Sequence, residues 1–158
     1  HGIEFSWDWE SSPKQKKDHA IEAGISASWS RGRRTDQEKS PLNSVEPWKS
    51  VAYLGWRGTE ESWGSRITAT YIGAKAQSEI DQTAGEPPPI DDSLVLDLVA
   101  WHKFEDHWEF RGGLNNLTDQ RYFLWSSARR GGGHSGSSTE ERNRQPGING
   151  FVGLKFEF

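Results

Sequence analysis

The chain of 158 residues contains no cysteine and no methionine. The absence of cysteine excludes a disulfide-stapled scaffold and a cysteine-ligated metal site. The absence of methionine means that the chain does not begin at a native start codon, and its amino terminus shows no signal-peptide pattern. We therefore expect His1 to be the first residue of a processed or partial chain.

Long hydrophobic runs are also missing. Only 32% of the residues are hydrophobic, and the run from Leu94 to Ala100 is broken by Asp97. A spanning helix needs about 20 apolar residues in succession, so a helical membrane span is excluded. A membrane barrel is not, because each strand presents only about five side chains to lipid. The formal net charge of −4 gives no electrostatic basis for binding nucleic acid, whose protein partners carry a basic surface.

Alternation of apolar and polar residues is present in seven segments, and the last of them continues to the final residue, Phe158. Successive side chains in a strand point to opposite faces, so each segment predicts a strand with one apolar and one polar face. No stretch shows helical periodicity. The predicted strands span residues 2–10, 19–31, 49–57, 63–73, 94–104, 108–116 and 150–158.

The connections between these segments alternate between short and long. Short turns lie around residues 12–15, 58–61 and 105–107, whereas long loops span 31–48, 74–93 and 117–149. In an up-and-down meander every second connection lies at the same end of the sheet. All the short turns therefore lie at one end and all the long loops at the other, as in outer-membrane barrels with short periplasmic turns and long extracellular loops.

The aromatic residues gather at the two ends of the predicted strands. Tryptophan is abundant, with nine residues. Two aromatic belts are typical of a membrane barrel, whereas a soluble β-sandwich or ligand-binding barrel would scatter its aromatics through a core. The short-turn end has Trp9, Trp56, Trp63, Phe104, Trp108 and Phe158, and the long-loop end has Trp29, Trp48, Tyr71 and Tyr122.

The polar face carries many charges, which a hydrated barrel interior accommodates. Its charged residues are Glu4, Asp8, Glu22, Arg66, Asp97, Arg111, Lys155 and Glu157. Seven strands do not close, because single-chain bacterial barrels have an even number of strands, from about 8 upward. Open edges would leave backbone groups unsatisfied in lipid. We therefore predict an all-β, antiparallel, up-and-down transmembrane barrel of which this chain is the carboxyl-terminal part.

Three features resemble the end of TonB-dependent outer-membrane receptors. These are Asp97 within SLVLDLVAW, the segment GLNNLTDQRY at residues 113–122, and the aromatic terminal strand after Pro146-Gly147. The opening Gly2-Ile3-Glu4-Phe5 is similar to another strand of that family. The resemblance covers residues 1–158 and implies the last seven strands of a plugged barrel of about 22 strands. The plug is expected to lie outside this chain.

Within that family, residues 41–56 and 122–125 resemble receptors for haem and haemoglobin, which include haemophore receptors. Siderophore receptors are the rival, and a passive outer-membrane barrel and a soluble β-barrel binding module are weaker alternatives. The resemblance implies energised uptake of haem from haemoglobin or a haemophore across the Gram-negative outer membrane. It implies no enzyme activity and no covalent cofactor. The energising TonB-type complex would act through the plug, and the barrel-assembly machinery would recognise the Phe158 strand.

Residues in the last long loop are the candidates for ligand contact. Trp125 is a candidate interface anchor, and Arg129, Arg130 and His134 are candidates for contact with haem propionates or an acidic partner. A hydrated loop without a binding role is the alternative. No haem ligand is assigned, because the family's haem-ligand histidine loop would lie upstream. His102, Asp106 and His107 surround a short turn and lack the defined ligand set of a metal site.

Overall fold

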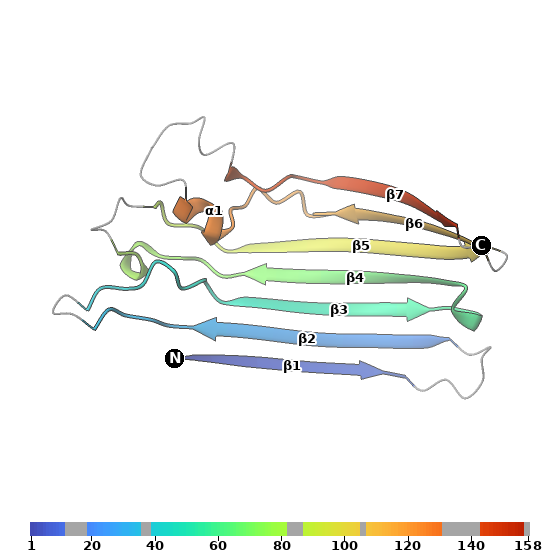
Figure 1. The fold of residues 1–158 in the computed structure, drawn as a ribbon, viewed down its shortest axis with the longest axis horizontal. Coiled ribbons are helices and arrows are strands. Elements are labelled where there is room, and N and C mark those ends of the chain that lie inside the picture. Colours follow the sequence, from blue (N-terminus) through green and yellow to red (C-terminus); the bar gives the residue numbers. More distant parts are fainter. Residues whose placement is uncertain (12–18, 36–38, 82–86, 105–106, 131–142, 157–158) are drawn as a thin grey trace.

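The structure is a single curved antiparallel sheet (Figure 1). In this computed structural model the described residues are 1–11, 19–35, 39–81, 87–104, 107–130 and 143–156. The strands follow one another in chain order from edge to edge, so each pairs with its sequence neighbours. They are β1 (Gly2–Glu10), β2 (Ala20–Ser30), β3 (Lys49–Arg57), β4 (Trp63–Ile72), β5 (Ser93–Phe104), β6 (Trp108–Asn115) and β7 (Asn149–Phe156).

The predicted seven-stranded antiparallel meander is confirmed. Each described strand end lies within one residue of its predicted position. The last two residues of the predicted terminal strand, including Phe158, lie outside the described residues. The sheet does not close on itself, and β1 and β7 form its two edges.

The register sorts the side chains of all seven strands onto two faces, because residues paired across adjacent strands lie on the same side of the sheet. One row of pairs, for example, joins Leu54, Ile67, Leu98 and Leu114. This apolar face is widely exposed: Val152 is 74% exposed and Ile3 is 69% exposed. Other exposed members of the apolar face are Phe5, Trp7, Trp9, Ile25, Leu54, Ile67, Leu114 and Leu154.

The opposite face is polar along β1 to β4 and mixed along β5 to β7. It carries Glu4, Asp8, Glu22, Arg66, Asp97, Arg111 and Lys155. Val99, Trp101 and Phe151 lie on this same face, which explains why the alternation in the fifth segment is blurred. Glu157 lies outside the described residues. An apolar face exposed along all seven strands, opposite a charged one, is the arrangement of a lipid-facing barrel wall.

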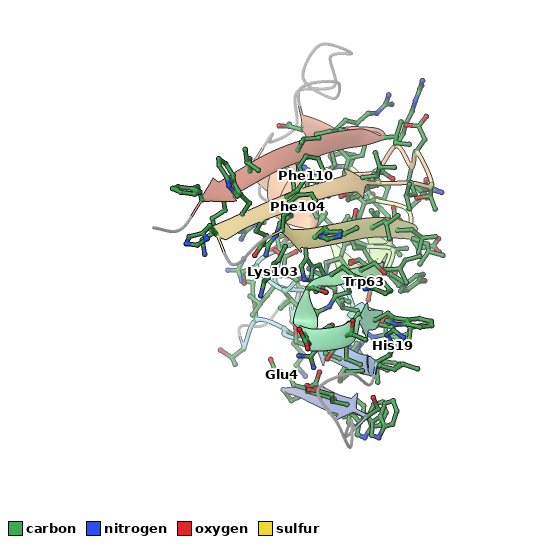
Figure 2. All side chains as sticks on the ribbon, turned by 90° about the vertical axis from the view of Figure 1, so that its right-hand side faces the viewer. Glu4, His19, Trp63, Lys103, Phe104 and Phe110 are labelled. Carbon is green, nitrogen blue, oxygen red and sulfur yellow. The ribbon has the colours of Figure 1, made fainter. Side chains whose placement is uncertain are left out.

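Aromatic rings pair at both ends of the apolar face. At the short-turn end Trp56 and Trp63 stack at 6.5 Å between ring centroids, and Trp108 lies 4.5 Å from Phe156. Figure 2 looks onto this end and shows Trp63 and His19 on the same side of the sheet. At the long-loop end Trp48 lies 5.3 Å from Tyr71.

Tyr122, the last of the aromatic residues predicted at the long-loop end, lies in the loop after β6 and not on a strand. It is partly buried, and desolvation together with the carboxylate of Asp97 raises its pKa.

The connections contain short helices that the sequence did not indicate. They are η1 (Thr59–Glu61) in a short turn, and η2 (Gln77–Glu79) and α1 (Trp125–Arg130) in long loops. None of these helices reaches two full turns, so each has too few residues to produce a detectable helical periodicity in the sequence. No helix in the described part of the chain is long and apolar enough to span a membrane.

Candidate functional site

The three long loops fold together at one end of the sheet around a small apolar cluster. This loop cluster consists of Ile80, Ile90, Trp125 and Ala128, with Phe123 packed against it. Trp125 is its centre and only 1% exposed. The indole Nε1 of Trp125 donates a hydrogen bond of 2.8 Å to the carbonyl oxygen of Asn43, in the first long loop. The Trp125 side chain therefore links the third long loop to the first, and it packs on Ile80 and Ile90 of the second.

A second connection joins the first and second long loops. The Asn43 amide donates to the backbone oxygen of Asp81 at 3.0 Å and accepts from the Asp81 backbone N–H at 2.7 Å. The Asp81 carboxylate accepts a hydrogen bond from Ser40 Oγ at 3.2 Å and lies 3.5 Å from a guanidinium nitrogen of Arg34. Asp81 is only 8% exposed, so these contacts satisfy a nearly buried acid.

The structure corrects the expectation that Trp125 is an exposed interface anchor. Helix α1 turns Trp125 and Ala128, three residues apart, toward Ile80 and Ile90, so the indole packs inside the loops. Arg129 follows on the same helix, and its Nε is buried without a hydrogen-bond partner among the described residues. The side chain of Arg130 and all of His134 lie outside the described residues, so their predicted contacts stay predictions.

A small pocket lies beside the loop cluster, between the first and second long loops. It has a volume of about 50 Å³ and is lined by Ser30, Arg31, Gly32, Arg33, Pro41, Leu42, Val45, Lys75, Ser78 and Glu79. Lys75 is only 5% exposed, and its ammonium donates to the carbonyl oxygen of Val45 at 3.0 Å. That ammonium also lies 5.4 Å from the centre of the Trp125 ring. Burial lowers the pKa of Lys75, against the opposing fields of Glu79 and Glu46.

A turn at residues 116–119 holds both ends of the last long loop. Asn116 is 3% exposed, and its amide donates to the carbonyl oxygens of Gln120 at 3.0 Å and Pro146 at 2.9 Å. Its backbone N–H donates to Asp97 at 2.8 Å, and the carboxylate of Asp119 accepts from the Ile148 N–H at 2.9 Å. Asn116 and Asp119 adopt positive φ angles of 54° and 46°, which Asn and Asp tolerate better than other side chains. The turn therefore has a structural role, because it ties the start of the last long loop to the residues that lead into β7.

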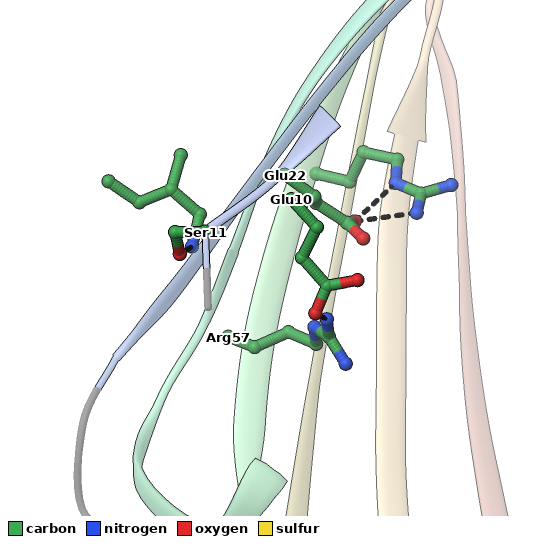
Figure 3. Close-up of polar contacts among 6 residues, drawn as sticks. Glu10, Ser11, Glu22 and Arg57 are labelled. Carbon is green, nitrogen blue, oxygen red and sulfur yellow. Dashed lines mark hydrogen bonds and ion pairs between the residues drawn. The ribbon is translucent and has the colours of Figure 1, made fainter. Parts of the chain in front are cut away.

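The polar face of β1 to β4 carries a network of ion pairs and hydrogen bonds. Tyr53 Oη donates to Asp8 at 2.7 Å, and Arg66 bonds to Glu22 through Nε at 2.9 Å and Nη2 at 2.5 Å. The Arg66 guanidinium also lies 4.6 Å from the centre of the Tyr53 ring. Nearer the short turns, Arg57 pairs with Glu10 (Figure 3). These partners neutralise one another across strands.

Asp106 lies outside the described residues, so the group of His102, Asp106 and His107 is not described as a whole. More generally, no group of three or more metal-ligating side chains occurs among the described residues. The two histidines instead lie against aromatic rings: His102 stacks on Phe104 at 4.6 Å and His107 lies 6.2 Å from Phe156.

The comparisons with known proteins agree with one another on the family. The family model described as "TonB dependent receptor-like, beta-barrel" matches residues 1–117. The chain is 27% identical over 139 residues to hemoglobin-haptoglobin utilization protein B of Neisseria meningitidis serogroup C, covering 81% of this chain and 17% of that protein. It is 25% identical over 147 residues to transferrin-binding protein A of Neisseria meningitidis serogroup B, covering 81% of this chain and 16% of that protein.

A solved structure has the same fold. The copper transporter OprC superposes with a TM-score of 0.72 at 15% identity, over 98% of this chain and 23% of that one. This likeness concerns the fold alone. The chain spans about a sixth of the length of the curated relatives it matches.

Proposed function

We propose that this chain, which belongs to the TonB-dependent receptor β-barrel family, is part of an outer-membrane receptor that takes up haem from a protein ligand. The family lies in the Gram-negative outer membrane, and the named relatives are receptors and binding proteins, not enzymes. A haemoglobin-haptoglobin utilization protein is among the relatives. Haem would be the transported ligand, and neither a covalent cofactor nor a catalytic group is part of the proposal.

One observation carries the proposal: the long loops pack into a single cap at one end of a lipid-facing sheet. Loops that bind a large ligand need a defined surface, and packing around Trp125 provides one. The proposed orientation places this cap outside the cell and the short turns in the periplasm. The carboxyl-terminal strand then ends at the periplasmic rim, where the barrel-assembly machinery would recognise it.

Energised transport would require the rest of the receptor. The plug and its contact with a TonB-type complex are expected in the part of the protein beyond these residues, as is any haem ligand. Uptake of iron from transferrin is a second candidate, because a transferrin-binding protein is among the relatives. A siderophore receptor is a third, since such receptors share the sequence features of the final strands.

Growth on defined iron sources tests these alternatives. The full-length gene would be placed in an iron-starved Gram-negative host that lacks its own haem receptors. We expect growth on haemoglobin and on haem, lost when the energising complex is deleted, and a Soret-band change when the purified receptor is titrated with haem. Growth on a ferric siderophore alone would contradict the proposal, and growth that persists without the energising complex would indicate a passive barrel.

A further inference from the structure

The pocket between the first and second long loops contains a buried cation that has no ionic partner in the part of the chain that the structure describes. Lys75 is 5% exposed, yet among the described residues no carboxylate lies within ion-pair distance of its ammonium. Its contacts are one carbonyl oxygen, that of Val45, and the face of the Trp125 ring. Lysine is rarely buried to this degree unless it is paired with an opposite charge.

Two further cations line the same pocket. The side chains of Arg31 and Arg33 are exposed, and neither has an ion pair or hydrogen bond with any described residue. The acid in the wall, Glu79, accepts a hydrogen bond of 3.2 Å from the Ala76 backbone N–H, which holds its carboxylate at the start of η2. Three cations against one restrained acid leave the pocket with a surplus of positive charge.

The walls of this pocket are fixed by backbone contacts. Arg33 bridges to Pro41, and the Leu42 N–H donates to the Gly32 oxygen at 3.1 Å. On the other side Lys75 bridges to Ile90, with its backbone N–H donating at 2.9 Å. Backbone contacts of the two loops therefore hold the walls of the pocket in place before a ligand binds.

We propose that this pocket binds a carboxylate from an acidic side chain of the protein ligand, at Lys75 with Arg31 and Arg33 at the rim. The identity of the protein ligand rests on the proposed function, whereas the affinity of the pocket for a carboxylate does not depend on it. A volume of about 50 Å³ accommodates a carboxylate group, whereas pockets for whole small molecules measure about 300–1,000 Å³. Exposed arginines suit recognition of a carboxylate, because a guanidinium can donate two parallel hydrogen bonds to it.

A carboxylate probe tests the chemistry directly. The full-length receptor in detergent would be titrated with a fluorescein-labelled hexaglutamate peptide at low salt, with fluorescence anisotropy as the readout. We expect the Arg31→Gln/Arg33→Gln double variant and Lys75→Gln each to bind roughly tenfold more weakly. Lys75→Gln retains a donor for the Val45 carbonyl, so the loops keep that contact.

The matched control is Lys39→Gln, which removes a cation from the same loop but does not line the pocket. It should bind the peptide like the unaltered receptor, and a hexaglutamine peptide should not bind either protein. Absence of binding to the unaltered receptor, or equal weakening by Lys39→Gln, would overturn the proposal.

Parallel titrations with haemoglobin and with free haem identify the source of the carboxylate. We expect the double variant to weaken haemoglobin binding and to leave haem binding unchanged. Equal loss of haem binding would assign the pocket to haem propionates and overturn the assignment to a protein ligand. An unaltered receptor that binds hexaglutamate but neither haem nor haemoglobin would refute the proposed function and leave the carboxylate site intact.

Discussion

Glu22 and Arg66 form an ion pair across Gly55, the residue that lies between them in the register of the sheet. The two charged residues belong to β2 and β4, and the intervening strand β3 has no side chain at this position to separate them. A Cβ atom on Gly55 would lie 2.3 Å from Glu22 Oε1, so the ion pair occupies the space of the missing side chain. A side chain at position 55 would therefore have to displace the Glu22 carboxylate.

Replacing Gly55 with valine should break this contact and destabilise the barrel by about 1–3 kcal/mol through overpacking. The free energy of unfolding in urea, measured on the full-length protein in detergent, tests the effect. Gly153→Val is the matched control, because the nearest atom to its added Cβ is 4.0 Å away. An equal loss in both variants would mean that a general effect of valine on this face of the sheet, and not the Glu22 contact, is responsible.

Leu98 should be sensitive to charge because its face of the sheet meets lipid. Leu98→Arg is expected to cost about 2–4 kcal/mol if the residue lies near the bilayer midplane. The register pairs Leu98 with Ile67 and Leu114. Folding into lipid vesicles at increasing urea concentration measures the cost. Thr68→Arg, on the polar face in the next row of pairs, should cost far less, and similar costs at both sites would contradict the assignment of the faces.

Trp125→Ala should loosen the three long loops while the sheet stays folded. Removal of a buried tryptophan typically costs about 3–5 kcal/mol. Here the loss is local, because the indole packs on Ile80 and Ile90. Hydrogen exchange at the Lys75 amide, which bonds to the Ile90 oxygen, should accelerate, whereas exchange in β4 should not.

Trp125→Phe separates packing from hydrogen bonding in the same experiment. It keeps an aromatic ring in the loop cluster but loses the bond to Asn43, a contribution of about 1 kcal/mol, and the volume of the second indole ring. Faster exchange throughout β4 in the alanine variant would show that the loops and the sheet unfold as one unit.

Asn116→Ala should detach the ends of the last long loop from each other. The substitution removes an amide that donates to the backbone oxygens of Gln120 and Pro146, and each lost hydrogen bond contributes about 1 kcal/mol. Limited proteolysis between residues 117 and 149 should become faster. The control is Asn115→Ala, whose exposed amide bonds only to the side chain of Asn149 among the described residues, and which should be cut at the original rate.

The ionisation of Tyr122 should make the same region sensitive to alkaline pH. Burial, aided by the Asp97 carboxylate, raises the pKa of Tyr122 above its ordinary value of 10.0. The folded state therefore holds the proton more tightly than the unfolded state. The stabilisation is complete below pH 10 and is lost as pH rises through the raised pKa.

A difference spectrum between the unaltered protein and Tyr122→Phe, recorded during an alkaline titration, isolates this hydroxyl. We expect its absorbance change above pH 10, and the proteolysis rate of the last loop should increase over the same range. Ionisation at or below pH 10 would contradict the burial of Tyr122.

Most of the sheet could be predicted from sequence because a strand with one apolar and one polar face alternates with a period of two, and most of the seven segments show that alternation. Even the irregular fifth segment is explained by its neighbours: Trp101 lies over Gly64 and Phe151 over Gly113, so these rings cover glycines on the polar face. A prediction made for each strand separately cannot identify such contacts between neighbouring strands.

The loops could not be predicted in the same way. Trp125 bonds to Asn43 over a separation of 82 residues, and no local pattern encodes a contact of that range. The sequence therefore suggested an exposed indole in a polar, glycine-rich loop, whereas the structure buries it. Lys75 was missed for the same reason: its burial depends on Val45 and Trp125, which lie in two other loops.

The open edges of the sheet impose a rule of parity on the complete barrel. Strands β1 and β7 run in the same direction, from the long loops toward the short turns (Figure 1). An antiparallel closure between two edges of equal direction requires an odd number of further strands, and this makes the total even. A single strand gained or lost would force a parallel pair at the seam, so a barrel that keeps antiparallel pairing throughout changes size by whole hairpins.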